Sequence, residues 1–75
     1  MKSRIRNGIR ELRASMGMTQ QQLADKIQLT RQTVIAIEGD KYSPSLETAF
    51  RIAEVFGVPL EQVFQYEPLD KSSQP

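Results

Sequence analysis

The side chains that could carry chemistry in this sequence are arginines, amides and hydroxyls, because the chain contains no histidine and no cysteine. These two absences exclude disulfide bonds and any zinc site built from Cys and His ligands. The sequence also contains no pair of carboxylates in a recognisable catalytic motif, and no glycine-rich loop of the kind that holds phosphate groups. We therefore expect neither an enzyme nor a cofactor or metal site.

Arg31 and Gln32 form an adjacent pair with strongly directional hydrogen-bonding groups. An arginine can donate two hydrogen bonds to O6 and N7 of guanine, and a glutamine can pair with N6 and N7 of adenine. Taken alone, however, the two residues fit an ordinary solvent-exposed surface better than a binding site. Their interpretation depends on the elements that position them.

The first predicted helix begins after Asn7, a residue type that caps helix N-termini. Its apolar residues Ile9, Leu12 and Met16 follow the i, i+3, i+7 pattern of a buried helix face. Gly17 comes directly after them, where a left-handed residue commonly ends a helix.

Two further helices are predicted on either side of a short turn. The first begins after Thr19, which has the capping-box spacing to Gln22. The chain turns at Gln28-Leu29, and Thr30 caps the next helix over residues 31–38, which Gly39 and Asp40 end. The residues expected to be buried in the two helices are Leu23, Ala24, Ile27, Val34 and Ile37.

A fourth helix is predicted over residues 46–56, after Ser43-Pro44-Ser45, because proline excludes helix from the residue before it. We expect these three residues to form a loop and the cap of the helix. Gly57 ends this helix, and Pro59 suits the first position of a short fifth helix. The residues expected to be buried in the fourth helix are Leu46, Ala49, Ile52, Ala53 and Phe56.

Two segments do not fit a helical pattern. Residues 2–6 alternate around Ile5, and residues 63–66 are aromatic and β-branched. We expect Arg4-Ile5-Arg6 and Phe64-Gln65-Tyr66 to pair as short antiparallel strands beside the helices.

Seventy-five residues are enough for one domain, which we place at residues 1–67, followed by a disordered polar tail at 68–75. Residues 1–13 carry five basic residues and one acidic residue, whereas residues 42–75 carry two basic and five acidic ones. This gradient suits a protein with one side that faces phosphates. No run approaches the roughly 18 apolar residues of a membrane-spanning helix, and the N-terminus lacks the apolar stretch of a signal peptide. We expect a cytoplasmic protein without membrane contact.

The segment over residues 19–38 has the sequence TQQQLADKIQLTRQTVIAIE. Two short helices joined by about three residues, with a small residue, Ala24, where they cross, form a helix-turn-helix. Together with I-R-E-L-R before it, and Y-S-P-S-L and V-P-L-E-Q-V-F-Q-Y after it, this motif resembles the phage-repressor and Cro-like family, also called the XRE family. The resemblance covers residues 7–66. Gln28 departs from it, since many members have glycine in the turn, and Gly39-Asp40-Lys41 replaces the more usual Asn/Arg-Gly-Lys.

The resemblance implies an all-α fold with five helices, of which the second and third form the helix-turn-helix, plus a small two-stranded β-element from the chain termini. It further implies that the third helix enters the major groove of double-stranded DNA. Matched position by position, the base-facing residues are Arg31, Gln32, Ile35 and Ala36, with Ile35 suited to a thymine methyl group. The expected phosphate contacts are Gln20, Thr33, Lys41, Tyr42 and Ser43. For Tyr42, simple packing against the loop is nearly as well supported.

The family resemblance also implies an internal ion pair between Arg13 and Glu38. Both residues lie on faces that the apolar pattern points inward. We interpret the pair as structural, tying the first helix to the end of the third.

We interpret the function as that of a DNA-binding transcriptional repressor that acts as a homodimer and has no small-molecule ligand. The alternative is an antitoxin or coactivator-like interaction module with the same fold. The expected dimer contacts are Phe50, Leu60, Phe64 and Tyr66. Phe64 and Tyr66 are taken to point to opposite faces of a strand, so that one closes the core and the other meets a partner chain. The competing interpretation is that both merely cover the core of the monomer.

Overall fold

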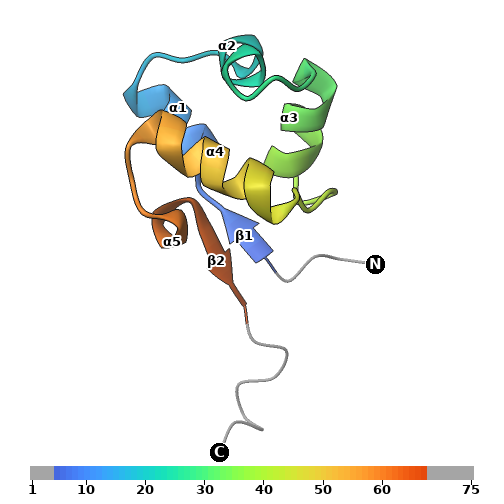
Figure 1. Ribbon diagram of the computed structural model, residues 1–75, viewed down its shortest axis with the longest axis vertical. Helices are drawn as coiled ribbons and strands as arrows, with labels where there is room; N and C mark the ends of the chain where they lie inside the picture. Colours follow the sequence, from blue (N-terminus) through green and yellow to red (C-terminus); the bar gives the residue numbers. More distant parts are fainter. Residues whose placement is uncertain (1–4, 68–75) are drawn as a thin grey trace, which may run out of the picture.

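The structure is a computed structural model, and it describes residues 5–67. This part of the chain contains five helices and one two-stranded sheet (Figure 1). In chain order the elements are β1 (Ile5–Asn7), α1 (Ile9–Ser15), α2 (Gln20–Lys26), α3 (Arg31–Glu38), α4 (Leu46–Phe56), α5 (Leu60–Val63) and β2 (Phe64–Tyr66). The expected helical fold with a small β-element is confirmed.

The helices surround one apolar core. In Figure 1, α2 and α3 lie at the top and right, α4 crosses the front, and the β-element lies below α4 with α5 beside it. The largest fully buried side chains come from five helices and the turn after α2: Ile9, Leu23, Ile27, Val34, Ile37, Ile52 and Val63. The expected inward faces of α2 and α3 are therefore correct. Within residues 5–67, no helix has both the length and the apolar character needed to cross a membrane.

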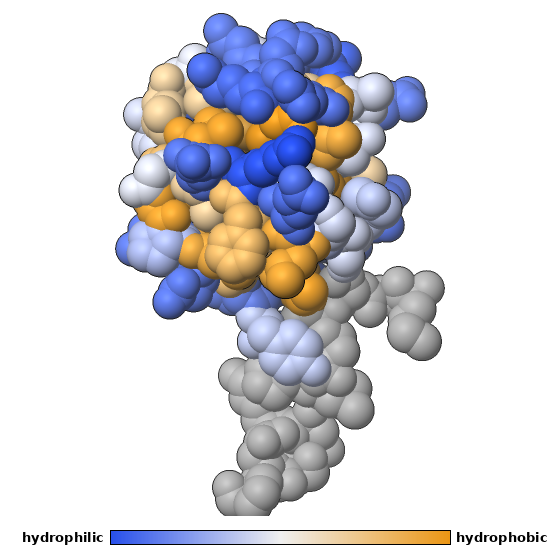
Figure 2. Space-filling view, in the orientation of Figure 1, coloured by the Kyte–Doolittle hydropathy of each residue, from blue (hydrophilic) through white to orange (hydrophobic). Residues whose placement is uncertain are grey.

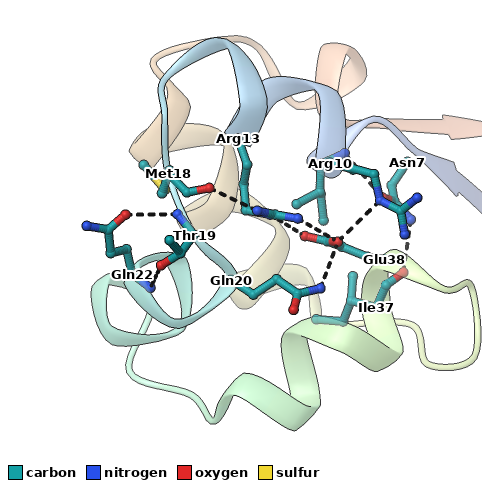
Figure 3. A network of polar contacts seen from close by, with 10 residues as sticks. Asn7, Arg10, Arg13, Met18, Thr19, Gln20, Gln22, Ile37 and Glu38 are labelled. Carbon is teal, nitrogen blue, oxygen red and sulfur yellow. Dashed lines mark hydrogen bonds and ion pairs between the residues drawn. The ribbon is translucent and has the colours of Figure 1, made fainter.

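Side-chain caps define where three of the helices begin. The Thr19 hydroxyl accepts a hydrogen bond from the Gln22 backbone N–H at 3.0 Å, and the Gln22 side chain accepts one from the Thr19 N–H at 2.8 Å (Figure 3). Thr30 and Ser45 cap α3 and α4 with one hydrogen bond each, in which the side-chain hydroxyl accepts from the backbone N–H three residues later. Each such cap stabilises its helix by about 1 kcal/mol. The capping box and both caps were predicted correctly.

Four residues with positive φ set the turns between the helices. Gly17 and Gly57, with φ of 62° and 68°, adopt the left-handed conformation expected after α1 and α4. Gln28 and Asp40 adopt it as well, both with φ of 61°. Because a side chain in this region clashes with the backbone, each of these two residues costs about 1 kcal/mol. Asp40, not Gly39, thus carries the left-handed turn after α3.

Two expectations about buried apolar residues are wrong. Met16 is 52% exposed, because α1 ends at Ser15 and the turn at Gly17 sends Met18 into the core instead. Leu46 is 68% exposed, because it is the first residue of α4 and precedes the part of that helix that reaches the core, which begins at Ala49.

Two helix starts also differ from the prediction. Asn7 belongs to β1, and Gly8 is the N-cap of α1. The Asn7 side chain still accepts a hydrogen bond from the Ile9 N–H at 3.2 Å, so it satisfies a helix donor from one position further out. Pro59 is the N-cap of α5 and not its first residue, because its ψ of 156° is extended.

The β-element is antiparallel, as expected, with Ile5 opposite Tyr66 and Asn7 opposite Phe64. Its first strand begins at Ile5 and extends one residue beyond the predicted one. Arg4, the first residue of the expected strand, and the expected polar tail at 68–75 lie outside the described residues.

Candidate nucleic-acid interface

The outward side of α3 presents the side chains that the sequence assigns to bases. Val34 and Ile37 are buried, which turns Arg31, Gln32 and Ile35 into solvent. The period of 3.6 residues per turn explains this division: Val34 and Ile37 share the buried face, and Gln32 and Ile35 share the exposed one. Ala36 is half-buried at the edge of the exposed side.

A groove of about 490 Å³ lies between this side of α3 and its neighbours. It brings together residues from α1, α2, α3 and the turn after α3: Arg10, Gln20, Gln32, Ile35, Ala36, Glu38, Gly39 and Lys41. Five of the nine residues expected to contact DNA therefore meet in one depression. We call the exposed side of α3 together with this groove the reading surface.

The other expected DNA contacts are placed differently. Arg31 lines a second groove, of about 580 Å³, which it shares with Gln20 and Gln21. The Thr33 hydroxyl lies 2.9 Å from that of Thr30, and the two share a hydrogen bond. Tyr42 and Ser43 are exposed in the loop after α3 and line neither groove.

Beneath the reading surface lies an ion pair between α1 and α3 (Figure 3). The Nε and Nη2 atoms of Arg13 donate to the two carboxylate oxygens of Glu38 at 2.6 and 3.1 Å. Arg13 Nη1 also donates to the Met18 carbonyl at 2.9 Å, which holds the turn between α1 and α2. The Glu38 side chain is only 2% exposed. The hydrogen bond to Glu38 raises the pKa of the Arg13 guanidinium, so this group stays charged at every accessible pH.

The same carboxylate orients Gln20 at the start of α2. Gln20 Nε2 donates to Glu38 Oε1 at 3.2 Å (Figure 3). A side-chain amide nitrogen carries two N–H groups, so one of them remains for another acceptor. Glu38 thus links α1, α2 and α3 at the base of the reading surface.

A second polar cluster, which the sequence analysis missed, attaches β1 to the end of α3. The Asn7 side-chain amide donates to the Ile37 carbonyl at 2.9 Å and to Asp40 Oδ1 at 3.1 Å. Arg6 pairs with Asp40 at 3.1 Å and with Glu67 at 3.0 Å. The sequence feature that points to this cluster is the unusual Gly39-Asp40-Lys41, because Asp40 accepts these hydrogen bonds from its left-handed conformation.

A contrasting surface covers α4, α5 and the sheet. Phe50 and Leu60 line one groove of about 540 Å³. Leu60 and Phe64 line a neighbouring groove of about 310 Å³, together with Ile5, Pro44, Leu46 and Ala49. Figure 2 shows hydrophobic side chains gathered on the face formed by α4, whereas the surface over α2 is hydrophilic. We call these eight residues, counting Tyr66 at the exposed end of β2, the apolar surface.

Phe64 and Tyr66 do not point to opposite faces of β2, because residues two apart in a strand share a face. Phe64 packs partly against the core, while Tyr66 is exposed at the end of the strand. Their difference in burial thus follows from distance along the strand and not from alternation.

Among the described residues, no group of three acidic, His or Cys side chains could hold a metal ion.

Known proteins similar to this chain share its helical region. The helix-turn-helix family matches residues 9–63. An uncharacterised HTH-type transcriptional regulator of Methanocaldococcus jannaschii is 49% identical over 63 residues, which are 84% of this chain and 96% of the relative. The immunity repressor protein of Bacillus phage phi105 is 36% identical over 88% of this chain and 46% of its own length.

Among solved structures, the restriction-modification controller protein C.AhdI from Aeromonas hydrophila superposes with a TM-score of 0.67 at 28% identity. The match covers 72% of this chain and 78% of that protein. All three similar proteins are named as regulators, repressors or controllers, and none as an enzyme.

Proposed function

The chain belongs to the helix-turn-helix family of DNA-binding transcriptional regulators, and from that premise we propose that it represses transcription by binding a two-fold symmetric DNA site as a homodimer. The observation that carries this proposal is the reading surface, where α3 exposes Arg31, Gln32 and Ile35 beside Gln20 and Lys41. A helix has the diameter to enter the major groove, where base edges are distinguishable.

In the proposed complex, residues 31–36 of α3 face the bases. Arg31 donates to guanine and Gln32 pairs with adenine, while Ile35 contacts a thymine methyl group beside Ala36. The Thr30 cap fixes the start of α3, so Arg31 and Gln32 project from a defined first turn.

The phosphate contacts lie around this helix. The free N–H of the Gln20 amide and the ammonium group of Lys41 border the same groove and can bind phosphate oxygens. Thr33, Tyr42 and Ser43 complete the proposed set. The Thr33 hydroxyl can accept from Thr30 and still donate to a phosphate, because a hydroxyl does both.

Three physical arguments support the proposed homodimer. One reading surface of this size makes too few contacts for tight specific binding, so two copies on a symmetric site are needed. The apolar surface, which includes Phe50, Leu60, Phe64 and Tyr66, offers side chains that would gain by burial. A two-fold interface uses the same surface on both subunits, so no second complementary surface is required. A two-stranded sheet is also only marginally stable by itself, and a partner subunit would support it.

The direct test is selection of bound sequences from a pool of randomised DNA duplexes. We expect enrichment of a site with two inverted half-sites, one helical turn apart. Footprinting on that site should then protect two major-groove segments on one side of the duplex. Failure to enrich any sequence, with capture of a specific protein instead, would favour the antitoxin or coactivator-like alternative.

A further inference from the structure

We propose that Arg10 on α1 is an additional phosphate-binding residue, so that the DNA contact extends to the first helix. This inference rests on the proposed DNA binding and adds a residue to it. Arg10 lines the groove of the reading surface together with Gln20, Gln32 and Lys41. Its side chain is 75% exposed, which leaves the guanidinium accessible from the groove.

The charge balance in the groove leaves Arg10 uncompensated. Glu38 is the acidic residue of this groove, and Arg13 binds both of its carboxylate oxygens. Gln20 provides a third hydrogen bond to the same carboxylate. Arg10 reaches it only at the outer limit of an ion pair, with Nε 4.0 Å from Oε1 (Figure 3). The single negative charge is therefore already matched by Arg13, and the charge of Arg10 remains available.

The contact between Arg10 and Glu38 also contributes little to folding. An ion pair with one exposed partner at 4.0 Å is weakened by water and by salt. The side chain can leave this position at small cost and bind a stronger anion. A guanidinium binds a phosphate group with two parallel N–H···O hydrogen bonds, both of them assisted by charge.

The position of Arg10 indicates a phosphate and not a base as its target. When α3 lies in the major groove, its own residues Gln32, Ile35 and Ala36 occupy the base edges. Arg10 approaches the DNA from a different helix, so its side chain meets the sugar-phosphate strand at the edge of the major groove. The proposed function already places Gln20, its neighbour from α2, at that strand.

The test is the salt dependence of binding by Arg10→Gln, measured between 50 and 200 mM salt. The ligands are the selected duplex and a random duplex of equal length. In the proposed homodimer the substitution removes one phosphate contact from each subunit, so the slope of log K against log salt becomes less steep by about 1.8. The affinity gap between the unmodified protein and the variant therefore narrows about twelvefold over this range, and it does so on both duplexes.

Two variants control for simple loss of charge. Lys26→Gln removes one positive charge from α2, where Lys26 is exposed and lines neither of the two grooves beside α3, and should leave the slope unchanged. Arg10→Lys keeps the charge and should keep the slope. Equal slopes for Arg10→Gln and Lys26→Gln would overturn the role of Arg10. If Lys41→Ala still lowers the slope in that case, the proposed function stands. If the unmodified protein binds no DNA, both proposals fall.

Discussion

The reading surface and the apolar surface differ in what lies beneath them. Under the reading surface, the Arg13–Glu38 pair and Gln20 form a hydrogen-bonded network that links three helices. The described part of the apolar surface instead exposes large apolar side chains: Phe50 is 54% exposed, and Leu46 and Tyr66 are exposed too. Hydrogen bonds order the side chains beneath the proposed DNA contacts, whereas the apolar groups of the other surface would gain from being covered.

This difference teaches how a small domain can divide two tasks. Recognition of bases requires polar side chains at fixed positions, so the conformational entropy of these side chains is lost during folding and not on binding. Association requires apolar area and tolerates less exact geometry. A chain of this size buries only about 60% of its unfolded surface, so burial of the second surface in a dimer would also stabilise the fold.

The largest expected effect concerns the buried support of the reading surface. Arg13→Met should destabilise the protein by about 3–5 kcal/mol, because it leaves the Glu38 carboxylate buried without its charged partner. For a domain of this size the melting temperature should fall by more than about 10 °C. Arg10→Met, on the exposed side of the same helix, is the matched control and should change it little. Equal melting temperatures for the two variants would contradict the structural role of Arg13.

The next effect concerns the apolar surface. Phe50→Asp should weaken the proposed dimer by at least roughly 2 kcal/mol, because each interface would bury two new charges. Sedimentation equilibrium at micromolar concentration should report a monomer for this variant and for Tyr66→Asp. Met16→Asp is the control, since Met16 is 52% exposed but lies outside the apolar surface. A monomeric unmodified protein, or a Tyr66→Asp variant that remains dimeric, would rule out this interface.

A smaller effect distinguishes base contacts from phosphate contacts within the reading surface. Arg31→Ala should lose about 1–3 kcal/mol on the selected site and relax the preference at one base pair. Lys41→Ala should weaken binding to all sequences alike and make the salt slope less steep by about 1 for each subunit of the bound dimer. Titrations of both variants on specific and random duplexes measure this. Equal losses of affinity for the two variants on both duplexes would contradict the assignment of Arg31 to a base.

The smallest effect compares the two left-handed residues that flank α3. Gln28→Gly should raise stability by up to about 1 kcal/mol, because glycine adopts a positive φ without strain. Asp40→Gly relieves the same strain but removes the hydrogen bonds from Arg6 and Asn7, so it should give no gain. Thermal melts of the two variants decide this. A gain of equal size for Asp40→Gly would mean that its polar cluster does not stabilise the fold.

The sequence by itself determined the features that depend on neighbours within about four residues. The sequence predicted the capping box of Thr19 and Gln22 and the caps at Thr30 and Ser45. It also predicted the bounds of α3 and α4. They were predictable because a cap and the helix it starts involve groups only three residues apart. The exposed side of α3 followed from helical periodicity once its buried residues were known.

Only the tertiary structure decided the features that depend on distant parts of the chain. Met16 and Leu46 have the apolar character of core residues, but each stands at the end of a helix, where the packing of other elements sets burial. The bond from Asn7 to Asp40 joins residues 33 positions apart, and the one from Arg6 to Asp40 joins residues 34 apart. Arg10 of α1 lines one groove with Gln32 and Lys41, which follow it by 22 and 31 positions in the sequence. A residue's own type sets which contacts it can make, but the path of the chain sets which partners come within reach.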